Sequence, residues 1–384
     1  MRILHVVAGL SPAGGGLSEL VPRFATEAAR QGHDVTIATV AAAGDTLSAA
    51  AEAAADAGVR IMRFAPSPPR AVYCSWTMAR GMGDLAAAAD IVHVHSQWTF
   101  PVWCGARAAL VAGRPLVMSP QGAFDPVRLA HSAWKKAAVA GIDRSLVQRA
   151  TVIHAASAAE EQWIRTFAAG RGGRGRVPPV WRIPMGVDMP ATTARPPRPD
   201  GRPRTVLAIG RLHPLKGLDL LVAAWGEVAR STAAAGWNLV IAGPDEQGSR
   251  AMLEEAIREE AIPRVTLAGP VHGEAKARML ADADLFVVPS RSENFGLVVP
   301  EALAAGLPVI ATRGAPWSEI DGVCGWWVEV GVSPIAAALT DAIRRSDAER
   351  VALGERGREL VKRTYRWDVV GREMTALYAA CTGR

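Results

Sequence analysis

The sequence has few of the features that identify a secreted, membrane-spanning or metal-binding protein. Its four cysteines lie far apart, so they show no metal-ligand spacing and no disulfide framework, and we expect reduced thiols in a cytoplasmic protein. No apolar run reaches the roughly 20 residues that a transmembrane helix needs. Residues 1–10 are apolar but too short for a signal peptide, without a clear cleavage site, and we interpret them as the start of a first strand.

Aromatic residues are also scarce, at 6% of a chain rich in Gly and Ala, which predicts close packing of helices on sheets. The net charge of +6 is uneven. Residues 1–195 hold 20 Lys or Arg against 13 Asp or Glu, whereas the remainder holds 23 against 24. A basic surface suits nucleic acid, anionic lipid or phosphorylated ligands. Because no nucleic-acid-binding module is recognisable, we favour the last two and expect no nucleic-acid partner.

The length of 384 residues suits two α/β domains better than one core. Apolar strand-like runs alternate with amphipathic helical runs in each half of the chain. A Pro-rich charged stretch separates the two arrays and indicates a linker. We therefore predict an α/β protein with two Rossmann-like domains that face each other across a cleft. The predicted parts are residues 1–188, the linker 189–204, residues 205–365, and a C-terminal helix, 366–384, that returns to the first domain.

The most informative stretch, residues 289–312, reads PSRSENFGLVVPEALAAGLPVIAT. It follows the apolar run 285–289, a predicted buried strand. A polar loop comes next, and we expect Gly296 to open a short helix that leads to a second strand. Glu293 lies in the loop and Glu301 in the helix. Ligands of open α/β sheets bind at the carboxyl ends of the strands, and a helix N-terminus there favours anions.

A second polar loop, residues 210–217, reads GRLHPLKG and also follows a predicted strand. Arg211 can grip two phosphate oxygens in a fork, while Lys216 supplies a mobile point charge. The loop lacks the GxxxxGK[ST] pattern, so it does not predict a P-loop ATPase.

Together these stretches resemble the family 4 retaining glycosyltransferases of bacterial polysaccharide biosynthesis. The resemblance covers most of the chain and is strongest over residues 205–330. It implies the GT-B architecture and an enzyme that moves a sugar from a nucleotide sugar, UDP- or GDP-linked, onto an acceptor hydroxyl with retention of configuration. No other cofactor is expected.

The resemblance also implies roles for individual residues. The catalytic group consists of Arg211, Lys216 and Glu293, which stabilise the diphosphate and hold the donor sugar. Glu301 accepts hydrogen bonds from the ribose, and Val271 reads the nucleobase through its backbone. The remaining residues expected to bind the donor are Gly15, Gly16, Gly210, Asn294, Phe295, Gly296 and Leu297.

The acceptor side is less specific in its signals. Many relatives have a histidine in the loop where this sequence has Gln121, and Gln cannot carry a proton charge. Asp125 and Arg128 are candidates for positioning the acceptor. His95 ends a predicted strand, 91–95, and we expect it to line the cleft. We expect His93 on the opposite face of the sheet from His95.

No metal site is predicted. His93 and His95 on opposite faces would be poor joint ligands. Asp282 and Asp284 match the DxD metal motif of another glycosyltransferase fold, but they join a helix end to a buried strand and are expected to be cap or turn residues.

Two alternatives to the transferase remain open, a nucleotide-sugar 2-epimerase and a non-catalytic nucleotide-sugar-binding protein. The expected partners of the transferase are a nucleotide sugar and an acceptor sugar or lipid-linked glycan. The basic excess of the first half predicts peripheral contact with an anionic membrane at its inner face, and a solvated basic face is the alternative.

Overall fold

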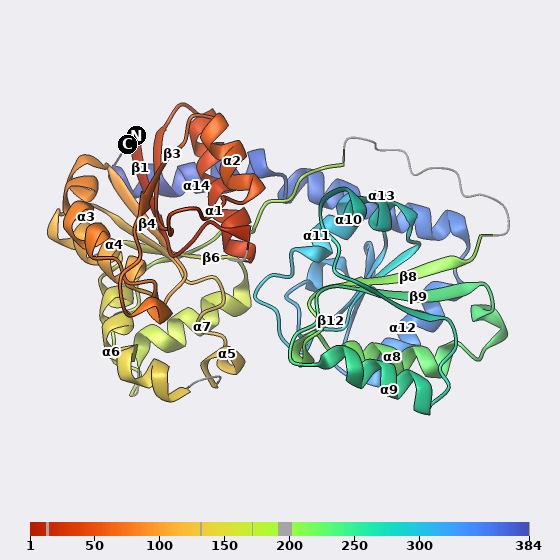
Figure 1. Ribbon diagram of the computed structural model, residues 1–384. Coiled ribbons are helices and arrows are strands. Elements are labelled where there is room, and N and C mark those ends of the chain that lie inside the picture. Colours follow the sequence, from red (N-terminus) through yellow and green to blue (C-terminus); the bar gives the residue numbers. More distant parts are fainter. Residues whose placement is uncertain (13–14, 131–132, 171, 191–201, 384) are drawn as a thin grey trace. The chain divides into compact units, whose positions relative to one another are not determined.

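The computed structural model describes residues 1–12, 15–130, 133–170, 172–190 and 202–383. Most of the predicted linker, residues 191–201, lies outside this part. The chain divides into two compact units. Unit 1 comprises Met1–Gly186 and Trp367–Arg384, and unit 2 comprises Val187–Arg366. The course of each unit can be followed by colour in Figure 1.

Unit 1 is built on a seven-stranded parallel sheet in the order β3-β2-β1-β4-β5-β6-β7. The inner strands are buried on both faces, which explains why they read as continuous apolar runs. The strands are β1 (Arg2–Val7), β2 (Asp34–Val40), β3 (Arg60–Phe64), β4 (Ile91–His95), β5 (Leu116–Ser119), β6 (Val152–Ala155) and β7 (Val180–Arg182).

Helices cover both faces of this sheet. One face packs on α3, α4, α6 and α7 in a single apolar cluster. The other face meets α1 and α14. The helices of unit 1 are α1 (Gly16–Arg30), α2 (Ala49–Asp56), α3 (Trp76–Ala88), α4 (Phe100–Val111), α5 (Pro126–Ala130), α6 (Ala133–Arg149), α7 (Ala158–Ala169) and α14 (Trp367–Thr382).

The C-terminal helix α14 packs on α1 within unit 1. A Cβ atom at Gly371 would lie 2.7 Å from the Cβ of Glu27, so the two helices approach closely only because residue 371 is glycine. Gly186 likewise makes room for the ring of Trp367, which a Cβ would meet at 2.4 Å. Small residues at these contacts therefore position the end of the chain against its beginning.

Unit 2 is built on a six-stranded parallel sheet in the order β10-β9-β8-β11-β12-β13. Its strands are β8 (Arg204–Ile209), β9 (Trp237–Ala242), β10 (Val265–Gly269), β11 (Leu285–Val288), β12 (Val309–Thr312) and β13 (Gly325–Val328). One face packs on α8, α9 and α12. Its helices are α8 (Leu218–Val228), α9 (Ser249–Glu259), α10 (Gly273–Asp282), α11 (Val298–Ala304), α12 (Val332–Arg344) and α13 (Asp347–Thr364).

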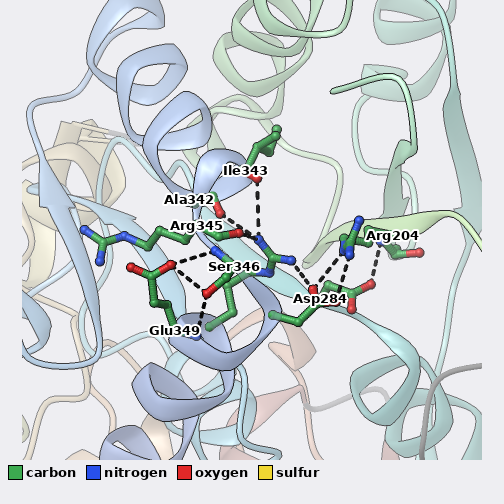
Figure 2. Close-up of polar contacts among 10 residues, drawn as sticks. Arg204, Asp284, Ala342, Ile343, Arg345, Ser346 and Glu349 are labelled. Carbon is green, nitrogen blue, oxygen red and sulfur yellow. Dashed lines mark hydrogen bonds and ion pairs between the residues drawn. The ribbon is translucent and has the colours of Figure 1, made fainter. Parts of the chain in front are cut away.

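A cluster of polar contacts joins α12 to α13, and Figure 2 labels Ala342, Ser346 and Glu349 within it. The Arg350 side chain, 3% exposed, donates to the carbonyl of Ala342 at 3.2 Å and so satisfies the open end of α12. Ser346 and Glu349 form a capping box at the start of α13. Hydrogen bonds from Arg204 hold the pKa of Asp347 at about 2. This cluster lies at the amino ends of β8 and β9, so it supports the sheet at the edge opposite to the candidate site.

Candidate functional site

The strand order of unit 2 reverses between β8 and β11. In open parallel sheets such a reversal opens a crevice at the carboxyl ends of the strands, where ligands bind. The two polar loops predicted from the sequence, residues 210–217 and 289–297, follow β8 and β11. They are therefore neighbours at this edge of the sheet.

The loop after β8 is packed tightly against the end of β11. Gly217 has φ 62°, and a Cβ there would lie 2.1 Å from the carbonyl oxygen of Pro289. Only glycine permits both the left-handed backbone and this approach. The amide of Arg291 donates to the carbonyl of Leu215 at 2.8 Å, and the Arg291 side chain pairs with Asp219. These contacts fix the position of the two loops relative to each other.

Lys216 and Glu293, predicted separately, meet in an ion pair between the two loops. Both side chains are largely buried, at 22% and 10% exposed. Ser290 donates a second hydrogen bond to the same carboxylate oxygen at 2.9 Å. Arg211 is not part of this cluster, because its guanidinium pairs with Glu246 at 2.7 Å and is half exposed.

The segment 294–297 presents a row of backbone donors beside Glu293. Within the described part of the chain, no acceptor takes the N–H groups of these four residues. The Asn294 side-chain oxygen is also buried without a partner among the described residues. The Phe295 ring packs on Trp317, whose indole donates to the Phe295 carbonyl at 2.5 Å. Consecutive free N–H groups in such a turn form a concavity that favours anions.

The prediction that Gly296 opens the helix is wrong. Gly296 has φ 80°, which a right-handed helix does not allow, and α11 begins two residues later at Val298. Glu301 lies in the first turn of α11 and pairs with Lys276 of α10 at 2.6 Å. Val271 is half-buried in the loop after β10.

In unit 1, the first glycine loop is described from Gly15 onward. Gly15 has φ 67° and precedes α1, which begins at Gly16. Gly14, which precedes these two glycines, lies outside the described residues.

The acceptor candidates of unit 1 have different surroundings. Gln121 has φ 54°, and both polar atoms of its amide are buried without a partner among the described residues. Asp125 is buried and accepts from the amide of Val127 at 2.9 Å, as a cap of α5. Arg128 is exposed on α5. The loop of Gln121 is held by Glu160, whose carboxylate accepts from the amide of Gly122 at 2.6 Å.

His93 and His95 lie on the same face of the sheet, so the expectation of opposite faces is wrong. Residues two apart in a strand share a face, and the two ring centroids are 4.0 Å apart. His5 of the neighbouring β1 joins them, with its Nδ1 2.8 Å from Nε2 of His95. His93 contacts Tyr378 and Ser119, and Ser119 contacts His154. His95 is fully buried in this network.

Burial keeps these histidines neutral, because it removes water from the charged form. It lowers the pKa of His5 to about 3 and that of His154 to about 4. The pKa values of His93 and His95 are lowered well below the usual range, first by burial and then by the neighbouring histidines.

Among the residues that the structure describes, His5, His93 and His95 form a group that could hold a metal, because their ligand atoms lie within 4.8 Å of one another. A metal there would compete with the His5–His95 hydrogen bond. The two carboxylates of the DxD sequence have structural partners. Asp282 accepts from Arg202 at 3.1 Å and Asp284 from the amide of Thr205 at 2.8 Å.

Sequence reasoning missed the residues that hold the predicted ones in place. Ser290 begins the polar loop after β11 without a motif of its own, and Lys276, Glu246 and Glu160 carry no local motif either. Each is recognised only from the structure, by its hydrogen bond to a carboxylate, guanidinium or amide elsewhere in the chain. Lys276 lies in a largely exposed turn of α10, so nothing in the sequence indicated that its charge has a partner.

Two family profiles match the chain. The one described as "Glycosyl transferases group 1" matches residues 203–346, and the one described as "Glycosyl transferase 4-like domain" matches residues 15–181. The matches fall in unit 2 and unit 1 respectively, and the first includes every unit 2 residue predicted to bind the donor.

Individual relatives agree. A D-inositol 3-phosphate glycosyltransferase of Nocardia farcinica is 30% identical over 81% of this chain and 73% of its own length. The putative colanic acid biosynthesis glycosyltransferase WcaL of Escherichia coli is 29% identical, and the match spans about half of each chain, 51% and 50%. The crystal structure of Anabaena HepE in complex with UDP and glucose superimposes with a TM-score of 0.75 at 19% identity, over 99% of this chain and 100% of that one.

Proposed function

Because the chain belongs to the family 4 retaining glycosyltransferases of GT-B fold, we propose that it transfers a sugar from a UDP- or GDP-linked donor onto an acceptor hydroxyl during glycan assembly. The observation that carries this proposal is the Lys216–Glu293 pair beside the free N–H groups of residues 294–297, at the strand-order reversal of unit 2. The cation and the N–H donors can bind the phosphates of a sugar diphosphate, and the carboxylate can accept hydrogen bonds from its sugar hydroxyls.

In this proposal the donor diphosphate lies on the N–H groups of residues 294–297. Lys216 turns from Glu293 to the phosphates, and Glu293 then accepts from hydroxyls of the donor sugar. Arg211 likewise exchanges Glu246 for phosphate oxygens, to which it can donate two hydrogen bonds. The Arg211 exchange is inexpensive, because an ion pair between partly exposed side chains contributes about 0–1 kcal/mol.

Glu301 takes the ribose hydroxyls, and Lys276 holds its carboxylate in position until the nucleoside arrives. The loop of Val271 lies at the end of β10 and reads the nucleobase. No protein nucleophile is required when the acceptor attacks from the face that the diphosphate leaves. Catalysis then consists of positioning and of stabilising the charge on the departing diphosphate.

The two alternatives have less support. Both family profiles describe glycosyltransferases, and nothing in them favours a 2-epimerase. A decayed, non-catalytic protein would not need Arg211, Lys216, Glu293 and Glu301 all present. Incubation with UDP- and GDP-sugars separates the three functions. Epimerisation without an acceptor supports the epimerase, turnover that depends on an acceptor supports the transferase, and binding without turnover supports the scaffold.

We further propose that unit 1 binds the acceptor at an anionic membrane surface on the cytoplasmic side. Residues 126–142, a range that includes α5 and the first part of α6, contain no Asp or Glu. The Trp134 side chain is 75% exposed on α6, with the Lys135 ammonium 5.5 Å from its ring centroid. Exposed tryptophan beside basic residues is typical of segments that lie in a membrane interface.

An open groove of about 670 Å³ adjoins this segment between α4 and α6. Apolar side chains line it, and Arg107 and Arg149 border it, an arrangement that fits acyl chains below an anionic head group. No helix among the described residues is both long and apolar enough to cross a bilayer.

Cosedimentation with phosphatidylglycerol vesicles at low and high salt tests the membrane part. We expect binding at low salt that salt weakens, since each basic residue near an anionic surface contributes about 1 kcal/mol and is screened. No binding at low salt, with full activity on a soluble acceptor, would remove the membrane contact and leave the transferase intact.

A further inference from the structure

The loop after β12, residues 313–320, contacts the loop that carries Glu293. The amide of Glu293 donates to the carbonyl of Gly314 at 2.8 Å. A Cβ at residue 314 would lie 2.1 Å from the carbonyl oxygen of Ser290, so this approach requires glycine. Thr312, the last residue of β12, donates its hydroxyl to the same Ser290 carbonyl at 2.5 Å. Two hydrogen bonds and one close backbone approach therefore join the two loops.

Trp317 makes the contact of this loop that is nearest to the free N–H groups of residues 294–297. The tryptophan is buried, and its indole nitrogen donates to the carbonyl of Phe295 at 2.5 Å. Its ring also packs on the Phe295 ring, with 5.2 Å between the centroids. A buried indole N–H usually has a hydrogen-bond partner. Here that partner is the backbone of the turn that presents the donors.

This hydrogen bond fixes the direction of the next amide. The carbonyl of Phe295 and the N–H of Gly296 belong to one planar trans peptide, so they point in opposite directions. Because the indole holds the carbonyl, the Gly296 N–H is directed away from Trp317, and it has no acceptor among the described residues. Hydrogen bonds in a chain also polarise one another, which makes the Gly296 N–H a stronger donor to an anion.

A tyrosine holds the indole in this orientation. The centroid of the Tyr365 ring lies 5.0 Å from that of Trp317 and 5.9 Å from that of Phe295. The Tyr365 hydroxyl donates to the carboxylate of Glu319, two residues after Trp317. Its backbone carbonyl accepts from the amide of Val187 at 2.8 Å. Because Tyr365 is itself buried, the indole has little freedom to turn away from the Phe295 carbonyl.

We propose that Trp317 is a positioning residue for the donor diphosphate. Its indole holds the Phe295–Gly296 peptide so that the Gly296 N–H is directed at the phosphates, and Tyr365 holds the indole. Trp317 touches no substrate and acts through the turn 294–297, which is then ordered before the donor arrives. The inference rests on the proposed function, because that function places the diphosphate on these N–H groups.

Calorimetry of the full chain with UDP and with GDP, and with the monophosphate of the nucleotide that binds, tests this role. Trp317→Phe keeps an aromatic ring but removes the indole N–H. The diphosphate should then bind roughly 3- to 10-fold more weakly, as loss of one hydrogen bond does. The monophosphate should lose less affinity, because it places one phosphate on the turn instead of two. The ratio of the two affinities should therefore fall.

Trp225→Phe is the matched control. Trp225 lies on α8 of the same unit, is 0% exposed, and donates its indole N–H to the carbonyl of Pro263 at 3.0 Å. Both variants remove the same atoms and one hydrogen bond from a buried site, so the Tm should fall in both. The affinity for the diphosphate should fall only in Trp317→Phe, which separates positioning from stability.

The inference is overturned if Trp317→Phe binds the diphosphate as the parent does, or if Trp225→Phe weakens it as much. Equal losses for the diphosphate and the monophosphate would also contradict it. Tyr365→Leu removes the ring beside the indole but leaves the indole N–H, and it should weaken the diphosphate in the same way. It decides the question if Trp317→Phe does not fold, and parental affinity there would likewise overturn the inference. Failure of the parent to bind either nucleotide would instead refute the donor site.

Discussion

Unit 1 should lose stability when the pH falls from 7 to 5, because four of its histidines are buried and neutral. His5, His93, His95 and His154 have folded-state pKa values depressed below the ordinary 6.5. The unfolded chain therefore binds more protons than the folded chain below pH 6.5. Stability rises with pH wherever this holds, so the histidine contribution is lost as the pH falls.

The size of this loss in the free energy of unfolding is set by protonation of the histidines in the unfolded chain. A histidine with a pKa of 6.5 in the unfolded state, and neutral when folded, costs about 2 kcal/mol between pH 7 and pH 5. Four of them cost about 8 kcal/mol, which is comparable to the whole stability of a typical domain, about 5–15 kcal/mol. His5 and His154, with folded pKa values of about 3 and 4, remain neutral over this range.

Hydrogen exchange of the amides of β1 and β4, corrected for the intrinsic effect of pH, measures this loss within unit 1. The four histidines take up protons on opening, while the Asp143 carboxyl, whose pKa burial raises to about 6, releases most of one. The slope at pH 5.5 should therefore correspond to about three protons taken up, and to about two in His154→Gln. The control is His272→Gln, at an exposed histidine of unit 2, which should leave the slope unchanged. Protection of β1 and β4 that is the same at pH 7 and pH 5 would refute the reasoning.

The remaining predictions concern the site and the membrane surface. Glu301→Gln should weaken binding of the free nucleoside diphosphate, whereas Glu293→Gln should chiefly impair the sugar nucleotide; calorimetry showing the opposite pattern would reverse the two assignments. Transfer activity should survive EDTA, because the DxD carboxylates have structural partners, and complete loss that added metal restores would contradict this. Trp134→Ala should reduce vesicle binding several-fold while leaving transfer to a soluble acceptor unchanged, and unchanged cosedimentation would place the membrane contact elsewhere.

The position of the donor loops in the fold was predictable, because each loop directly follows an apolar strand in the sequence. Glu293 and Lys216 each follow an apolar strand, and parallel strands present their carboxyl ends at one edge. Their contact was not predictable, since it requires β8 and β11 to be neighbours although two strands lie between them in the chain. The pairing of Glu301 with Lys276 was not predictable either, because it requires α10 and α11 to be neighbours in the fold.

The features missed in unit 1 have local causes. Helix α4, Phe100–Val111, shows no polar face, so helical periodicity did not reveal it. Strand β3 is an edge strand with arginines at two of its five positions, which hid its apolar pattern. The histidine cluster was missed because His93 and His95 were assigned to opposite faces, and because His5 comes from a strand that is distant in the sequence.

Calorimetric titration with UDP and with GDP tests the central claim most directly, that the loops after β8 and β11 hold the donor diphosphate. Lys216→Ala should weaken the nucleotide that binds by roughly 1.5–3 kcal/mol without unfolding the protein, and Arg211→Ala by a similar amount. Lys362→Ala, an exposed lysine of α13, is the matched control and should bind as the parent does. Parental affinity in both site variants would contradict the account.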